Sequence, residues 1–232
     1  MSNTYTQRRG ELQTYFDRTA VEHWKRLTSD VKVSRIRETV RAGRNSMRDT
    51  FLEWLPEDLS GRRVLDAGCG TCALSVEMAR RGAAVVAVDI SPTLVELGRE
   101  RAPKDLAPGS IDFRVGDMQS ADFGEFDHIV AMDSLIHYPL ADVVAVASSL
   151  MARTRASLVM TFAPRTPALT LMHAVGRLLP KGGDRAPAIE PVGEVALSRE
   201  LTRVGTGAGW QVARTRRIVS GFYTSQALEL KR

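Results

Sequence analysis

The sequence predicts an α/β fold in which helices cover both faces of a seven-stranded, mostly parallel sheet. Short apolar runs alternate with helical periodicity from residue 63 onward, which is typical of strand–helix–strand units. The chain closes on two expected strands, residues 210–218 and 221–231, joined at Ser220-Gly221. That turn indicates a hairpin, which makes the last strand antiparallel to its neighbours.

Five earlier apolar runs are expected to supply the parallel strands. A helix is predicted between the second and third runs, because Ser91 suits an N-cap and Pro92 suits the first helical turn. Residues 143–151 repeat at helical spacing and predict a second helix. The five runs are Val64–Leu65, Ala84–Asp89, Ile111–Val115, Phe126–Met132 and Leu158–Phe162.

The two ends of the chain are expected to add helices to this sheet. Residues 1–58 are helical by pattern and are interpreted as an N-terminal arm, and residues 59–232 as the domain itself. A proline-rich stretch over about 165–196 is interpreted as an insertion on the substrate side. The last helix is expected over residues 198–209.

Charge is distributed unevenly along the 232 residues, whose formal net charge is +5. Residues 51–164 hold ten Lys and Arg against sixteen Asp and Glu, whereas both flanking segments are basic. No apolar run is long enough to span a membrane, and no secretory signal opens the chain. Cys69 and Cys72 are too few for a disulfide framework, so a cytoplasmic protein is expected.

A glycine motif follows the first expected strand and opens a helix. Asp66-x-Gly68-x-Gly70 lets the backbone turn sharply and approach a ligand closely. Asp89 ends the second strand, where a carboxylate can accept both hydroxyls of a ribose. Asp117 follows the third strand, near the expected place of an adenine. Together these positions predict a nucleoside site on a Rossmann-like sheet.

Three interpretations of this site stay open on the motif alone. The acids after three successive strands favour S-adenosylmethionine, as in class I methyltransferases. Gly68-x-Gly70-x-x-Ala73 also fits a looser dinucleotide fingerprint, and Cys69-x-x-Cys72 fits a redox pair. Under the first interpretation Cys72 replaces a usual glycine, and its side chain is expected to crowd the methionine end of the cofactor. The expected cofactor-binding residues are Asp66, Gly68, Gly70, Asp89, Ile90, Asp117, Met118 and Asp133.

Several longer segments make the chain resemble the magnesium-protoporphyrin IX methyltransferases, in their bacteriochlorophyll-pathway form. The resemblance covers nearly the whole chain and implies methyl transfer from S-adenosylmethionine to a propionate of magnesium protoporphyrin IX. Magnesium then enters only as part of the porphyrin, and no metal site of the protein's own is expected. The segments are Tyr15-Phe16-Asp17, Trp24-Lys25-Arg26, residues 66–70, 133–139 and 162–166, and Phe222-Tyr223.

The resemblance also directs attention to residues around the substrate. His137 is the candidate catalytic residue, through a hydrogen bond to the propionate, acceptance of a residual proton or axial approach to magnesium. Alternatively, it caps the helix that begins near Pro139. Asp133 either faces the cofactor or caps the following turn. The expected substrate-binding residues are Tyr15, Phe16, Trp24, Tyr138 and Arg165.

The expected partners follow from the same resemblance. It implies delivery of the porphyrin by the large porphyrin-binding subunit of magnesium chelatase, and loose association with the photosynthetic membrane. A nucleic-acid substrate is not expected, because Asp133-Ser-Leu-Ile-His stands where base methyltransferases carry Asn/Asp-Pro-Pro-Tyr/Phe. The alternatives are a methyltransferase for another anionic or hydrophobic small molecule, a nicotinamide-dependent oxidoreductase and a non-catalytic nucleoside-binding module.

Overall fold

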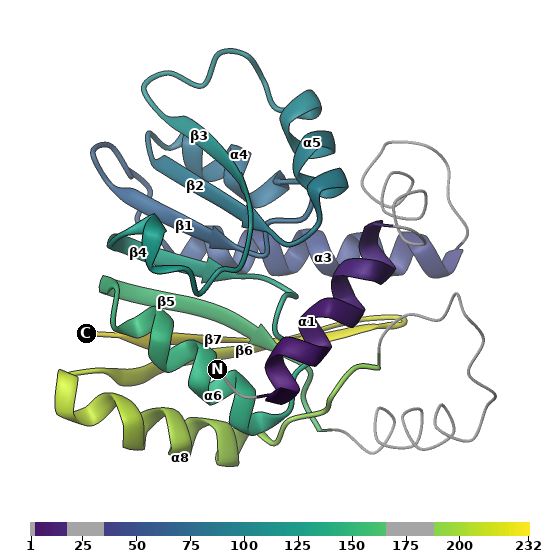
Figure 1. The fold of residues 1–232 in the computed structure, drawn as a ribbon, viewed down its shortest axis with the longest axis vertical. Helices are drawn as coiled ribbons and strands as arrows, with labels where there is room; N and C mark the ends of the chain where they lie inside the picture. Colours follow the sequence, from purple (N-terminus) through teal and green to yellow (C-terminus); the bar gives the residue numbers. More distant parts are fainter. Residues whose placement is uncertain (1–2, 18–34, 166–187) are drawn as a thin grey trace.

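Seven strands form one sheet in the computed structural model, which describes residues 3–17, 35–165 and 188–232 (Figure 1). Their order across the sheet is β3-β2-β1-β4-β5-β7-β6. The first five in that order run parallel, β7 is antiparallel to β5, and β6 is antiparallel to β7. The strands are β1 Arg63–Ala67, β2 Ala84–Asp89, β3 Ser110–Val115, β4 Phe126–Ala131, β5 Thr154–Phe162, β6 Gln211–Ser220 and β7 Tyr223–Lys231.

Helices cover both faces of the sheet, and each face has its own apolar core. Residues of α3 and α4 pack on one face, and residues of α1, α6 and α8 pack on the other, as Figure 1 shows. Two short 3-10 turns, η2 Ala121–Phe123 and η3 Thr206–Ala208, complete the described elements. The α-helices are α1 Asn3–Tyr15, α3 Arg35–Trp54, α4 Ala73–Arg80, α5 Pro92–Arg101, α6 Leu140–Met151 and α8 Glu194–Gly205.

The predicted architecture is confirmed, including the antiparallel last strand, but two boundaries were wrong. β5 begins at Thr154 instead of Leu158. The buried polar Thr154 and Ser157 pair with β4, but with the exposed Arg155 and Ala156 between them they give no apolar run. The last helix spans Glu194–Gly205 instead of 198–209. It ends at Gly205 because the chain turns back there and Trp210 packs against that glycine, leaving no room for a side chain.

The chain reverses its direction of travel across the sheet at β1. β2 and β3 lie on one side of β1, and β4 and β5 lie on the other. Connections that leave adjacent parallel strands in opposite directions open a crevice at the carboxyl ends of those strands. The carboxyl ends of β1, β2 and β4 therefore define where a ligand is most easily held.

Helix α3 is part of the core of the sheet domain. Met47 and Phe51 on one side of the helix are fully buried against the face that carries α4. Gly43 lies directly against the ring of Tyr223, where an added Cβ would be 2.7 Å from the ring carbon Cγ. The division of the chain at residue 58 stays a prediction, and residues 166–187 of the expected insertion lie outside the described residues.

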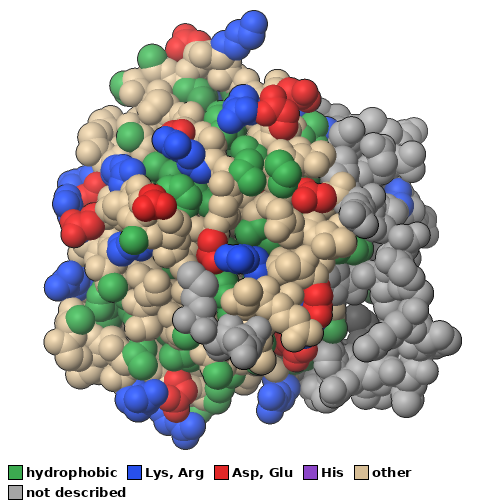
Figure 2. All heavy atoms as spheres, viewed as in Figure 1, with side chains coloured by type: hydrophobic (Ala, Val, Ile, Leu, Met, Phe, Trp, Pro, Cys, Tyr) green, Lys and Arg blue, Asp and Glu red, His purple; other side chains and the backbone are tan. Residues whose placement is uncertain are grey.

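The surface carries charges of both signs. On the face shown in Figure 2, Lys and Arg side chains alternate with Asp and Glu side chains instead of gathering in one patch. Among the described helices, none is both long and apolar enough to cross a membrane.

We expect Gly43→Ala to lower the free energy of unfolding by about 1–3 kcal/mol, because the new methyl group overpacks the contact with Tyr223. Gly10→Ala is the matched control, since a Cβ there meets nothing within 4 Å. Alanine's better helix propensity should make that variant about 0.5–1 kcal/mol more stable. Urea denaturation of both variants measures the difference, and equal stability would contradict the tight α3–β7 contact.

Candidate active site

A pocket of about 310 Å³ lies at the carboxyl ends of β1, β2 and β4. This volume falls in the range of small-molecule sites, which are usually concave and largely preformed. The loop after each of these strands contributes to the wall, and α1 and α3 supply the rest. The strand order and the pocket therefore indicate the same ligand position, at the carboxyl ends of β1, β2 and β4.

The glycine loop between β1 and α4 forms the floor. Gly68 and Gly70 have φ angles of +82° and +54°, a region that glycine enters without steric cost. A Cβ on Gly68 would collide with the side chain of Ser134. The amides of Gly68 and Cys69 donate to the Val88 carbonyl at 2.8 and 3.0 Å, which ties the loop to β2. The backbone can therefore approach a ligand closely.

Asp89 ends β2 and lines the pocket with only 8% of its surface exposed. Its two carboxylate oxygens accept the amides of Gly70 at 2.8 Å and Ser91 at 2.9 Å. Burial raises the pKa of this carboxyl, and those amide hydrogen bonds act against the rise. Since each carboxylate oxygen has two acceptor positions, Asp89 is held in place and can still accept two hydroxyl groups.

Asp66 lies below the loop and is nearly fully buried. Ser75 donates its hydroxyl to the carboxylate at 2.6 Å. Burial raises the pKa of Asp66 to about 7, the Ser75 hydrogen bond opposes that rise, and the neighbouring Asp89 adds to it. The carboxyl therefore changes its protonation near neutral pH.

Asp117, the third predicted acid, interacts with α1. Its carboxylate accepts the hydroxyl of Tyr5 at 2.8 Å and the amide of Gln119 at 2.9 Å, and it forms an ion pair with Arg9. The neighbouring Met118 lines the pocket, as Ile90 does after β2. A contact between Asp117 and an adenine stays a prediction.

Asp133 follows β4 in a left-handed backbone conformation, with φ +55°. Its amide donates to the Thr161 hydroxyl at 2.7 Å. Its carboxylate accepts the hydroxyls of Tyr223 and Ser225 at 3.1 Å and lies 3.6 Å from the guanidinium of Arg44. The side chain thus joins β7 to α3 at the edge of the pocket.

Comparison with known proteins places the chain among relatives. A family model described as the magnesium-protoporphyrin IX methyltransferase C-terminus matches residues 131–232, and a methyltransferase-domain model matches residues 64–156. The magnesium-protoporphyrin O-methyltransferase of Rhodobacter capsulatus is 44% identical over 232 residues, the full length of both chains. This chain belongs to the magnesium-protoporphyrin O-methyltransferase family.

Solved structures agree with that membership. The crystal structure of magnesium protoporphyrin IX methyltransferase from Synechocystis PCC 6803 with bound S-adenosylhomocysteine superposes with a TM-score of 0.83 at 30% identity. It covers 96% of this chain and 99% of the other. The Synechocystis sequence named magnesium-protoporphyrin O-methyltransferase is 30% identical over the full length of both chains. The predicted Rossmann-like methyltransferase fold is confirmed.

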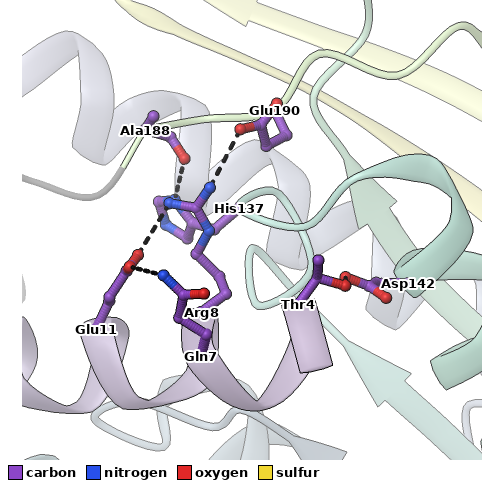
Figure 3. A network of polar contacts seen from close by, with 8 residues as sticks. All are labelled: Thr4, Gln7, Arg8, Glu11, His137, Asp142, Ala188 and Glu190. Atoms are coloured by element: carbon purple, nitrogen blue, oxygen red, sulfur yellow. Dashed lines mark hydrogen bonds and ion pairs between the residues drawn. The ribbon is translucent and has the colours of Figure 1, made fainter. Parts of the chain in front are cut away.

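His137, which the resemblance to this methyltransferase family singled out, lines the pocket. Its Nδ1 lies 3.1 Å from the carbonyl oxygen of Ala188, and Figure 3 shows the ring directed toward that carbonyl. Because a carbonyl oxygen only accepts hydrogen bonds, Nδ1 carries a proton. In the neutral ring, Nε2 then holds the lone pair.

The aromatic residues expected at the methyltransferase substrate site have different positions. Phe16 and Tyr138 line the pocket, whereas Tyr15 packs edge-on against Phe16 with ring centroids 5.3 Å apart. Tyr138 stacks on Tyr5 at 5.1 Å between centroids. Trp24 lies outside the described residues.

Arg165 is not part of the pocket wall. Its side chain is exposed, and its amide donates to the Val192 carbonyl at 3.0 Å. That backbone contact fixes the point where the chain returns toward α8. A substrate contact by Arg165 stays a prediction.

Helix α1 contributes Tyr5 and Leu12 to the wall of the methyltransferase pocket, and hydrogen bonds and an ion pair hold the helix in place. Thr4 donates to Asp142 at 2.8 Å and Arg8 contacts Glu190 at 3.3 Å, as Figure 3 shows. Beyond the end of α1, Asp17 accepts the Ser91 hydroxyl at 2.6 Å. These contacts join α1 to α5, α6 and the strand-like segment before α8.

The sequence analysis assigned no individual side chain of α3 to the site. Arg41, Arg44, Asn45 and Arg48 all line the pocket. Their spacing of three, four and seven residues places them on one helix face. That spacing was available in the sequence, but it did not show that this face of α3 would lie against the pocket.

The expected crowding by Cys72 does not occur. This residue has φ +60° and is fully buried, with its sulfur turned toward Gly98 of α5 and away from the pocket. The sulfur lies 3.4 Å from that of Cys69, and both cysteines are free. Gly98 leaves the room that the Cys72 side chain occupies, so the glycine loop keeps its shape.

Within residues 3–17, 35–165 and 188–232, no group of three His, Cys, Asp or Glu side chains is placed to hold a metal ion.

We expect the stability of Asp66→Asn relative to the wild type to increase as pH rises from about 4 to 7 and then to level off. In this interval the wild-type carboxyl is still protonated when folded but ionised when unfolded, so ionisation favours unfolding. Thermal unfolding of the ligand-free protein at several pH values measures this, with the exposed Asp112→Asn as the control for charge loss. A constant difference between Asp66→Asn and the wild type would contradict the raised pKa.

Proposed function

We propose that this protein transfers a methyl group from S-adenosylmethionine to a propionate carboxylate of magnesium protoporphyrin IX. The products are the monomethyl ester and S-adenosylhomocysteine, in the synthesis of chlorophyll or bacteriochlorophyll. The observation that carries this proposal is the full-length similarity to magnesium-protoporphyrin O-methyltransferases. The pocket residues at the carboxyl ends of β1 and β2 support the proposal independently, since they suit a nucleoside.

The residues present fit S-adenosylmethionine. Gly68 and Gly70 leave the backbone bare where a Cβ would close the floor, and Asp89 offers fixed acceptors for the ribose hydroxyls. Ile90 and Met118 supply apolar sides for the base. Bound there, the cofactor supplies a methyl group on a positively charged sulfur.

The acceptor needs little chemical activation. A propionic acid has a pKa close to the 4.3 of a glutamate side chain, so it is ionised and nucleophilic at neutral pH. The protein must instead align the carboxylate oxygen with the methyl group and exclude water. Such positioning contributes about 7 kcal/mol or more to lowering a barrier.

His137 is the residue best placed to act on the acceptor side of the reaction. With Nδ1 donating to Ala188, the neutral ring presents a lone pair on Nε2. That lone pair suits the two electrophilic partners the substrate offers, a residual acid proton of the propionate and the magnesium ion in the porphyrin. The protonated ring, in which Nε2 also carries a hydrogen, instead suits a hydrogen bond to the ionised carboxylate.

Aromatic and apolar residues supply a wall for a flat macrocycle. The stacked pair Tyr5–Tyr138 and the ring of Phe16 line the pocket between α1 and the loop after β4. Flat aromatic faces pack well on one another. The substrate contacts predicted for Trp24 and Arg165 belong to the same proposal.

Delivery of the porphyrin by the large subunit of magnesium chelatase, and peripheral contact with the photosynthetic membrane, belong to the same proposal. Val219 and Phe222 support an apolar contact of this kind, since about two thirds of each residue's surface is exposed. They lie at the β6–β7 turn, on the same edge of the sheet as the pocket, because β6 runs parallel to β5.

Direct assay tests the reaction. The protein is incubated with S-adenosylmethionine and magnesium protoporphyrin IX, and the monomethyl ester is sought by chromatography and mass spectrometry. Binding of S-adenosylhomocysteine without any ester would refute the substrate and leave methyl transfer to another small molecule. Absence of S-adenosylhomocysteine binding would refute the cofactor assignment as well.

We expect His137→Ala to lower kcat about 10²-fold or more, as loss of a general base or a positioning group does. The dissociation constant of S-adenosylhomocysteine should stay within twofold, because His137 does not hold the cofactor in this proposal. Added imidazole should restore part of the turnover by occupying the vacated space. Unchanged kcat in the variant would remove His137 from the catalytic machinery.

A further inference from the structure

Three arginines form a row along one face of α3. Arg41, Arg44 and Arg48 follow one another at intervals of three and four residues, and all three line the pocket. The opposite face of the helix, with Met47 and Phe51, is buried in the core. The helix therefore holds this arginine row rigidly against the pocket.

The row places three arginines on the wall of a pocket whose described acids are Asp66, Asp89 and Asp133. Arg44 lies 3.6 Å from Asp133, whose carboxylate also accepts the Tyr223 hydroxyl. Arg48 is half-buried, yet within the described part of the chain its guanidinium has no ion pair or hydrogen bond. Holding a guanidinium partly out of water without a partner is unfavourable, so this position is suited to receive an anion.

The length of the row exceeds what one carboxylate requires. Arg41 and Arg48 are separated by seven residues, which is about 10 Å along a helix. A guanidinium binds a carboxylate through a planar pair of donors, so one or two arginines satisfy one carboxylate. The row is therefore long enough to contact an extended ligand at more than one point.

The Arg41 end of the row lies toward the β6–β7 turn, whereas the nucleoside residues follow β1 and β2. Arg41 lies less than one turn from Thr39, which packs against Gly221 in the β6–β7 turn. Asp89, by contrast, holds its place through the amides of Gly70 and Ser91 in the interior. A ligand that contacts the whole row must extend from the reacting centre toward the outside.

We propose that the arginine row binds the second propionate of the porphyrin, the one that is not methylated. The row would then fix the macrocycle while the first propionate meets the methyl group, and it would select substrates with two carboxylates. This inference rests on the proposed function, because it takes the porphyrin as the substrate. It adds a specificity determinant that lies outside the glycine loop and His137.

The test compares magnesium protoporphyrin IX with an analogue in which the second propionate is a primary amide. Both amide regioisomers are prepared, and the one that yields an ester has the reacting propionate free. We expect wild-type kcat/KM to be at least tenfold higher for the dicarboxylate. In Arg48→Gln that preference should fall to threefold or less, with the loss confined to the dicarboxylate. Arg48→Lys should retain part of it, because the charge remains.

Two further measurements distinguish binding of the second propionate from a role of the row in cofactor binding or in stability. The dissociation constant of S-adenosylhomocysteine should stay within twofold in Arg48→Gln. Its unfolding temperature should be no lower than that of the wild type, since the side chain has no partner to lose within the described residues. Arg199→Gln on α8 is the control for lost charge, because its side chain is 74% exposed and distant from the pocket. It should leave the preference at the wild-type value.

The outcomes that overturn the inference are distinct from failure of the proposed function. An unchanged preference in Arg48→Gln and Arg41→Gln would overturn it. So would an equal loss on both porphyrins together with tenfold weaker S-adenosylhomocysteine binding, which would assign the row to the cofactor's carboxylate. If the wild type esterifies neither porphyrin, the proposed function itself fails.

Discussion

The carboxylate of Asp133 connects the elements that enclose the pocket. It follows β4, accepts hydroxyls from β7 and lies beside Arg44 of α3, although these segments are about 90 residues apart in the chain. Hydrogen bonds to an ionised group are stronger than neutral ones, and burial strengthens them further. Its left-handed backbone turns the side chain toward β7, away from the usual path of a strand. Together with the burial of Met47 and Phe51, this contact holds α3 and with it one wall of the pocket.

The pocket contains both aspartate and arginine side chains, and burial affects the charge of the two kinds differently. Burial raises the pKa of Asp66 and Asp89, so the carboxyls nearest the glycine loop ionise less readily than exposed ones. An arginine keeps its charge in such surroundings. The carboxyls lie beside the glycine loop, while the arginines lie on the α3 side of the pocket. A cationic cofactor and an anionic acceptor each find a compatible region.

The sequence predicted the features that depend on local backbone geometry. Gly68, Gly70 and Asp89 could be assigned from their spacing because a sharp turn after a buried strand restricts the residue types allowed. The hairpin and the antiparallel last strand followed from Ser220-Gly221 in the same way. Resemblance to the methyltransferase family, and not spacing, supplied His137.

Contacts between distant segments were not predictable in this way. The Tyr5 and Arg9 partners of Asp117, and the Tyr223 partner of Asp133, arise only when the helices are packed on the sheet. Cys72 was misjudged for a related reason, since the space it fills is left by Gly98 on another helix. The start of β5 was missed because Thr154 and Ser157, which pair with β4 through the backbone, are polar and give no apolar pattern.

Helix α3 carries core residues on one side and pocket residues on the other. The packing of the core and the position of the pocket arginines are therefore linked. A helix moves as a stiff rod, so any repacking beneath Met47 or Phe51 displaces Arg41, Arg44 and Arg48 together. The distances between the three arginines consequently stay the same when the helix moves. During divergence of the family, a substrate with differently placed anionic groups would be accommodated by replacing individual arginines. Substitutions in the buried face of α3 would instead shift the whole row and change the stability of the fold at the same time.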